Sequence, residues 1–199
     1  MNLEMKDRME SGETSETGVG EEVARLKKKR FTGPLARVLT AVATLGPLGT
    51  KMPAPGTWGS GAGMLFYAAV LFRYNNFENF PVFIGLVTFF ALVAAGICHV
   101  AEKNIGRVDP GEVILDEFVA MPFVYFGSEA FIKESNHGWL WFFLGFALFR
   151  FFDVLKPIGI NKLQRFPGGA GIVLDDLAAA LAACGSLHLL HLLGRFFGL

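Results

Sequence analysis

Five carboxylates interrupt the apolar stretches of this 199-residue sequence, and they are the residues best suited to chemistry. They are Asp116, Glu117, Asp153, Asp175 and Asp176. On membrane-insertion scales an Asp at a helix centre costs about 2.5–3.5 kcal/mol, so each acid needs a partner, a proton or a bound cation. Pairing with Arg150, Lys156 or Arg165 would be structural. A set of five acids instead favours a site for Mg²⁺, which prefers oxygen ligands and keeps positions for water and phosphate oxygens.

Two basic residues are spaced to share a helix face with one of these acids. Arg150, Asp153 and Lys156 follow one another at intervals of three residues, which places them within an arc of about 120° on a helix. Pro157 disfavours helical geometry at the residue before it, so the sequence predicts that Lys156 ends the helix at the membrane surface. A phosphate dianion can meet its ammonium group there.

Two glycine-containing turns precede apolar stretches and predict phosphate contacts, because helix N-termini with close backbone approach bind phosphate. The same composition also describes a plain turn with Thr57 as the N-cap. The residues assigned to phosphate or substrate binding are Thr57, Gly59 and Ser60 of the first turn, Gly169 and Gly171 of the second, and Lys156. Asp109, which Pro110 and Glu112 follow, predicts mainly a helix N-cap.

The elements that must position these residues are membrane helices. Hydrophobic residues make up 52% of the sequence and Phe alone contributes 21, which is unusual for a soluble domain. Five apolar stretches follow the first turn, at about residues 57–72, 80–99, 113–126, 139–155 and 172–197. Helices are the only plausible spans at these lengths. We therefore predict an all-α, polytopic membrane bundle of about five spans, in which residues 34–49 insert, re-enter or lie at the interface.

The charge pattern predicts which membrane face carries the acids. Residues 1–30 are polar, lack a signal peptide and end in the basic cluster 27–30, so we expect a disordered cytoplasmic tail before a membrane domain over residues 31–199. With that tail inside, positive charge in the later connections alternates as the positive-inside rule expects. Two of the acids then begin one span, Asp153 ends the next, and the last pair begins another. All five gather near the cytoplasmic face.

Four motifs, in order, resemble the phosphatidylglycerophosphatase A family over about residues 40–185. They are Pro55-Gly56-Thr57-x-Gly59-Ser60, Asp116-Glu117-Phe118-Val119, Phe149-Arg150-x-x-Asp153-x-x-Lys156-Pro157 and Gly168-Gly169-x-Gly171-Ile172-x-x-Asp175-Asp176. The resemblance implies a compact helical fold and Mg²⁺-dependent removal of the terminal phosphate from phosphatidylglycerophosphate, giving phosphatidylglycerol on the cytoplasmic side of the bacterial inner membrane. Ala120, Ala180 and Ile158-Gly159 depart from the family pattern, while the acids are intact.

Within such a phosphatase we expect the five acids to share Mg²⁺ binding and water activation, and Arg150 and Lys156 to stabilise charge on the transferring phosphoryl group. No single acid is assigned as the base. The sequence contains no Cys followed by Arg at phosphatase spacing, no Asp-x-Asp nucleophile motif and no Pro-Ser-Gly-His signature, so a covalent phosphoenzyme is not expected.

Other function classes fit parts of the sequence. An ion-coupled transporter also uses intramembrane carboxylates, but it needs a path that reaches both faces. A CDP-alcohol-type transferase uses Mg²⁺ and membrane aspartates, but its Asp-Gly-x-x-Ala-Arg run is absent. A membrane scaffold is the structural alternative. We expect a lipid substrate and membrane lipids as partners and no nucleic acid, because the chain offers no wide basic surface or recognised module. The sequence does not indicate an oligomeric state.

Overall fold

The computed structural model describes residues 33–74, 79–107, 109–156 and 169–197, and in these residues the chain is helical with no strand. The predicted all-α fold is therefore confirmed. The elements in chain order are α2 (Pro34–Ala43), α3 (Pro47–Lys51), α4 (Pro55–Phe66), the π-helical turn Tyr67–Leu71, the 3-10 turn Phe72–Tyr74, α5 (Phe80–Ile105), α6 (Leu115–Val124), α7 (Glu129–Glu134), α8 (Gly138–Leu155) and α9 (Gly169–Phe197). The predicted tail, residues 1–30, lies outside the described residues.

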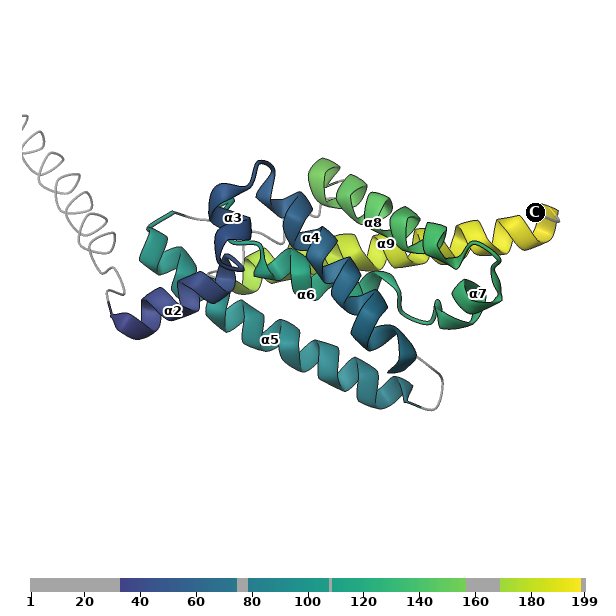
Figure 1. Cartoon of the computed structure of the whole chain (residues 1–199), viewed down its shortest axis with the longest axis horizontal. Helices are drawn as coiled ribbons and strands as arrows, with labels where there is room; N and C mark the ends of the chain where they lie inside the picture. Colours follow the sequence, from purple (N-terminus) through teal and green to yellow (C-terminus); the bar gives the residue numbers. More distant parts are fainter. Residues whose placement is uncertain (1–32, 75–78, 108, 157–168, 198–199) are drawn as a thin grey trace, which may run out of the picture.

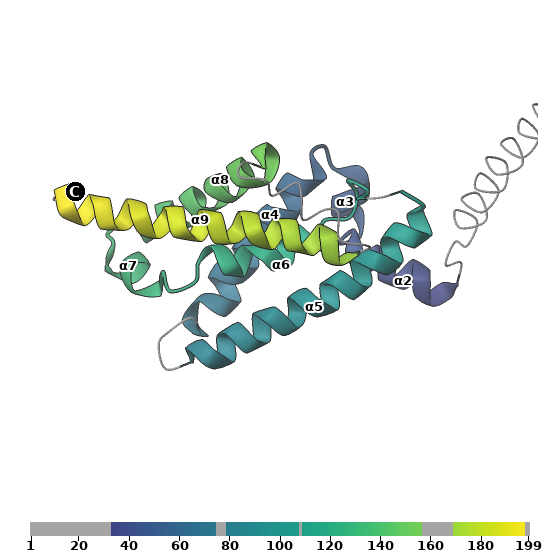
Figure 2. The same ribbon diagram turned by 180° about the vertical axis from the view of Figure 1, so that it is seen from behind.

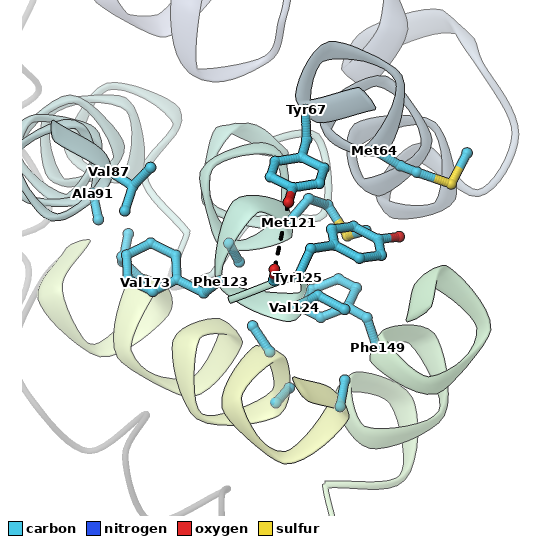
Figure 3. Close-up of a cluster of buried hydrophobic side chains, with 14 of the residues drawn as sticks. Met64, Tyr67, Val87, Ala91, Met121, Phe123, Val124, Tyr125, Phe149 and Val173 are labelled. Carbon is cyan, nitrogen blue, oxygen red and sulfur yellow. Dashed lines mark hydrogen bonds between the residues drawn. The ribbon is translucent and has the colours of Figure 1, made fainter. Parts of the chain in front are cut away.

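The short helix α6 forms the centre of the bundle. It packs against α4, α5, α8 and α9, which surround it in the close-up of the core (Figure 3). Seven of its ten residues are buried, including Pro122 inside the helix. An apolar helix of this length is covered by protein rather than by lipid, which explains why its hydrophobicity resembled that of a membrane span.

Helix ends bring distant parts of the chain together at one end of the molecule. Figure 1 shows α4, α6 and α9 beginning, and α5 and α8 finishing, toward the end where α2 and α3 lie; the reverse view in Figure 2 agrees. The opposite end carries α7 and the C-terminus. Acids placed in the first turn of α6, the second turn of α9 and the last turn of α8 must therefore lie near one another.

Three helices are long and apolar enough to cross a membrane: Phe80–Ile105, Gly138–Leu155 and Ala170–Phe197. Their outer faces expose large apolar side chains such as Phe89, Leu92 and Leu192. In water these side chains would remain hydrated, whereas lipid solvates them without cost. The chain is thus a membrane protein with three candidate spans among the described residues. The predicted number of about five spans is not confirmed.

The two remaining apolar stretches take other forms. Residues 57–72 become α4 followed without a break by the π-helical and 3-10 turns, and residues 113–126 contain only α6.

Residues 34–49 divide into α2 and α3 at Leu45 and Gly46, which have φ angles of 47° and 65°. Helix α2 packs along α5, where Asn104 Nδ2 donates to Thr40 Oγ1 at 2.9 Å. With ten residues, α2 is too short to cross a bilayer by itself.

An aromatic core holds the middle of the bundle. The rings of Tyr67 and Tyr125 stack with centroids 4.7 Å apart, and the Tyr67 hydroxyl donates to the Tyr125 carbonyl at 3.4 Å (Figure 3). The Tyr125 hydroxyl in turn donates to the Phe142 carbonyl at 2.6 Å. Gly145 on α8 faces the Tyr125 ring so closely that a Cβ would lie 2.5 Å from it. This core fixes how α4, α6 and α8 meet, and therefore how their charged ends are placed.

Candidate functional site: an acidic cavity at one end of the bundle

A cavity of about 180 Å³ lies where α6 and α9 begin and α8 ends. All five carboxylates predicted from the sequence line it. Lys156 also lines it, together with Asp109, Gly111, Val113 and Ile172. The structure thus brings together the five predicted carboxylates, the first and last of which are 60 residues apart in sequence, because three helices present their ends to the same space.

The carboxylates are buried and incompletely paired. Asp116, Asp175 and Asp176 are exposed by 4%, 2% and 5%. One oxygen each of Asp116 (Oδ1), Glu117 (Oε2) and Asp176 (Oδ2) is buried with no hydrogen-bond partner among the described residues. A buried carboxylate oxygen without a partner is costly, so this arrangement needs protons, water or a cation.

Arg150 ties three helices together beside the cavity. Its Nη1 atom lies 2.7 Å from Asp153 Oδ2 and 3.1 Å from Glu117 Oε1, and it donates to Ser60 Oγ at 3.3 Å. Asp153 is one turn after it on α8, while the other two partners come from α6 and α4. The guanidinium therefore fixes the orientation of two of the five acids. It is not among the described residues that line the cavity, whereas Lys156 is.

Lys156 joins the end of α8 to the beginning of α9. Its ammonium group forms an ion pair with Asp175 Oδ2. Burial acts to lower the pKa of Lys156, but the hydrogen bond and charge of Asp175 outweigh it, so the pKa lies above its usual value and the group is charged. The residue has φ 41° at the C-cap of α8, and its backbone N–H closes the helix on Phe152. The predicted helix end at Lys156 is confirmed; Pro157 lies outside the described residues.

The glycines of α4 serve the contact with α6. A Cβ at Gly59 would lie 2.7 Å from Glu117 Oε2 and 2.8 Å from Ile114, and one at Gly56 would overlap the same carboxylate. Ser60 is fully buried and donates to the Gly56 carbonyl at 2.6 Å while it accepts from Arg150. These residues lie behind Glu117, outside the lining of the cavity. Their predicted contact with phosphate stays a prediction.

Other parts of the sequence-based picture need revision. Thr57 is exposed and lies inside α4, whose N-cap is Ala54 with φ 52°, so Thr57 is not the N-cap. Asp109 does not cap α6 either, because that helix begins at Leu115 after Ile114. Asp109 instead has φ 47° in the connecting loop and lines the cavity. Its reading as a cap is wrong, because backbone pairing of Ile114 N with Ala43 O at 3.0 Å, rather than the Asp-Pro-Gly-Glu signal, sets where α6 starts.

Beside that loop, an ion pair holds the exposed rim of the site. Arg107 Nη2 and Glu112 Oε1 are 2.5 Å apart, and the hydrogen bond from Arg107 holds the pKa of the Glu112 carboxyl below its usual value.

The second predicted glycine turn is only partly described: Gly169 and Gly171 lie in the first turn of α9, Gly171 is buried one turn before Asp175, and Gly168 lies outside the described residues.

The donor chemistry of the cavity fits a hard cation, although the described residues hold no preformed metal site. Several carboxylate oxygens converge from three helices, three of them lack partners, and Mg²⁺ takes oxygen ligands. Among the described residues, however, no group of three His, Cys, Asp or Glu side chains is arranged to hold a metal ion. Binding of a cation would therefore require side-chain rotation within the cavity.

The comparisons with known proteins agree with the motifs. The model of the family described as phosphatidylglycerophosphatase A matches residues 41–191. The phosphatidylglycerophosphatase A of Haemophilus influenzae is 36% identical over 132 residues, which are 66% of this chain and 75% of the relative. That of Escherichia coli is 30% identical over 67% and 72% of the two chains, and a putative phosphatidylinositol-3-phosphatase of Bacteroides thetaiotaomicron is 30% identical over 64% and 77%. No solved structure matches.

The matched residues span α3 to most of α9 and include the whole acidic cavity. The chain therefore belongs to the phosphatidylglycerophosphatase A family.

Proposed function

We propose that this protein is a phosphatase of membrane lipids, which hydrolyses the terminal phosphate monoester of phosphatidylglycerophosphate to phosphatidylglycerol and phosphate. The observation that carries the proposal is the cavity lined by six carboxylates, the five predicted from the sequence and Asp109, and by one lysine, within a chain of this family. The names of the relatives from Haemophilus influenzae and Escherichia coli support the substrate. The relative from Bacteroides thetaiotaomicron carries another name, but it too denotes removal of a phosphate monoester from a lipid.

We propose Mg²⁺ as the cofactor and five of the six cavity carboxylates, Asp116, Glu117, Asp153, Asp175 and Asp176, as its ligands. The unpartnered oxygens of Asp116, Glu117 and Asp176 support this assignment, because a cation would offset the cost of burying them. When bound, Mg²⁺ supplies charge neutralisation at the phosphoryl oxygens and lowers the pKa of a coordinated water. The same donor set would otherwise remain strongly self-repelling.

The chain's own residues divide the remaining work. Lys156 lines the cavity, where its ammonium group can donate to a non-bridging phosphoryl oxygen while it keeps its ion pair with Asp175. Arg150 acts as a positioning residue, because its guanidinium already engages Glu117, Asp153 and Ser60. One cavity carboxylate takes a proton from the attacking water. The P–O bond to the glycerol breaks, and the alkoxide leaves as the hydroxyl of phosphatidylglycerol after it receives a proton.

We place the cavity at the cytoplasmic face of the bacterial inner membrane. Basic residues support this orientation: Lys51, Lys103 and Arg107 lie at the ends of α3 and α5 beside the cavity end, and the basic cluster 27–30 precedes α2. Positive charge is retained on the cytoplasmic side. Lys133 and Arg195 lie toward the opposite end, where α7 and the C-terminus are found (Figure 1).

The ion-coupled transporter draws no support from the comparisons. The relatives and the family are named as phosphatases, and the carboxylates line one cavity at one end of the bundle. A transport path would require ionisable groups that continue toward the other end. The phosphatase is therefore the single function proposed.

Substrate and reaction are tested together with detergent-purified protein. Incubation with phosphatidylglycerophosphate and Mg²⁺ should yield phosphatidylglycerol and inorganic phosphate in equal amounts, measured by mass spectrometry and by phosphate assay. Phosphatidylinositol 3-phosphate and a phosphodiester lipid serve as comparison substrates. Turnover of the first at a similar rate would widen the substrate class to lipid phosphate monoesters. Failure to release phosphate from any monoester by folded protein would overturn the proposal.

A further inference from the structure

A second cavity lies on the other side of α6 and is apolar. It has a volume of about 310 Å³ and is formed between α2, α4, α5 and α6. Helix α6 contributes Leu115, Phe118, Val119 and Pro122. These residues are spaced i, i+3, i+4 and i+7, so they form one face of the helix. Asp116 and Glu117 lie on the opposite face, which lines the acidic cavity. One short helix thus separates a charged chamber from an apolar one.

The apolar cavity opens to the lipid-facing surface. Four of its lining side chains are also among the exposed large hydrophobic residues: Val42 at 42%, Phe66 at 42%, Phe90 at 52% and Val93 at 41% exposure. They come from α2, α4 and α5, so the opening faces outward between these helices. In a membrane the occupant of such a groove is drawn from hydrocarbon chains, because water would find no hydrogen-bond partners on its apolar walls.

We propose that this groove binds an acyl chain of the lipid whose phosphate occupies the acidic cavity, and we call it the acyl groove. The proposal rests on the proposed function and extends it to the substrate's tail. The sequence of α6 supports one ligand that occupies both cavities, since Leu115 and Phe118, which line the apolar cavity, immediately flank the acid pair. With the phosphate headgroup on one side of the first turn of α6 and the acyl chain on the other, the phosphate ester of the lipid would be held at a fixed depth in the membrane.

Such a groove would make the enzyme selective for chain-bearing substrates. Orientation by a remote part of the substrate raises the rate at the reacting centre, and truncated substrates lose that contribution. Long-chain phosphatidylglycerophosphate should therefore be preferred over a dibutanoyl analogue by more than their partition into micelles explains. Val93 is the residue of choice for testing this, because its side chain is half-exposed and can be enlarged without entering the core.

The experiment compares Val93→Trp with Leu92→Trp. Leu92 is the neighbouring residue on α5, is 69% exposed and does not line the groove, so it is the matched control. Val93→Trp should lower kcat/KM for the dioleoyl substrate by about tenfold, with part of the loss in kcat, and leave the dibutanoyl substrate within about twofold. Leu92→Trp should change neither. Equal losses on both substrates, or no loss on the long one, would overturn the acyl groove.

A binding measurement separates failure of the groove from failure of the proposed function. A phosphatidylglycerophosphate analogue with a diazirine in one acyl chain is crosslinked to wild-type protein in detergent, beside the same lipid without the terminal phosphate. Crosslinks to Phe90, Val93 or Phe118 should be stronger for the phosphorylated lipid and should decrease in Val93→Trp. Equal crosslinking by both lipids would mean that bulk lipid fills the groove and would overturn the proposal, whether or not phosphate release occurs.

Discussion

In the aromatic core, the buried polar atoms of Tyr67, Tyr125 and Ser128 each have a hydrogen-bond partner in the structure. In the acidic cavity, which lies on the same central helix, three carboxylate oxygens have none. The first region follows the general rule for buried polar groups, and the second breaks it. Folding alone would not select the second arrangement, because replacing unpaired buried charge commonly stabilises a protein. The difference therefore supports the proposed assignment of the second region to chemistry.

The largest expected effect is at the acids. Asp116→Asn keeps the shape of the side chain but removes one negative charge from the cavity, so turnover should fall about 10³-fold. Its unfolding temperature in detergent should stay the same or rise, because a buried charge without a partner is lost. Both quantities are measured on the same preparation. Turnover within tenfold of wild type would remove Asp116 from the proposed site.

A second expected effect concerns the cavity's cation. Lys156→Met keeps the apolar stem and removes the ammonium group, so turnover should fall about 10²-fold through loss of charge stabilisation at the phosphoryl group. Lys156→Arg is the control and should retain more activity, because it keeps the positive charge opposite Asp175. The comparison is made by steady-state kinetics with Mg²⁺ present. Equal activity of the Met and Arg variants would show that charge at this position is not used.

The contact between α4 and α6 gives a smaller effect. Gly59→Ala would press a methyl group against Glu117 and Ile114, so we expect a loss of about 1–3 kcal/mol in stability and reduced turnover. Gly61→Ala is the matched control on the same helix, because nothing lies within 4 Å of its would-be Cβ. It should stabilise the protein by about 0.5–1 kcal/mol. Thermal unfolding of both variants tests this prediction. An unchanged unfolding temperature in Gly59→Ala would contradict the close approach of α4 and α6.

The smallest effect is expected in the aromatic core. Tyr125→Phe removes the hydroxyl that donates to the Phe142 carbonyl and should cost about 1 kcal/mol of stability. Its turnover at a temperature where it remains folded should equal that of wild type. A loss of activity larger than the loss of folded protein would mean that the core and the cavity are not separable in the way the comparison assumes.

The sequence predicted the gathering of the acids better than it predicted the membrane topology. The gathering of Asp116, Asp153 and Asp176 follows from helix direction alone, since consecutive helices alternate and the acids lie near the ends that meet. The span count does not follow, because apolar composition cannot distinguish a helix covered by lipid from one covered by protein, as α6 is.

Long-range packing accounts for the other differences. The roles of Gly56 and Gly59 depend on Glu117, which lies 58 residues beyond Gly59 in sequence, so local turn chemistry could not reveal that these glycines make room for a carboxylate. Asp109 carried a genuine capping pattern, but the pairing of Ile114 with Ala43 moved the helix start past it. A carboxylate next to Pro and Gly, seven residues before the acid pair, was the available signal for its place at the cavity.

The most direct measurement is phosphate release from phosphatidylglycerophosphate by wild type and by an Asp175→Asn, Asp176→Asn double variant, each with Mg²⁺ and with EDTA. We expect wild type to be active with Mg²⁺, inactive with EDTA and restored by added Mg²⁺, and the folded double variant to be inactive in every condition. Phosphate release that persists in the double variant, or that does not change when Mg²⁺ is removed and added back, would contradict a metal-dependent phosphatase site in the acidic cavity.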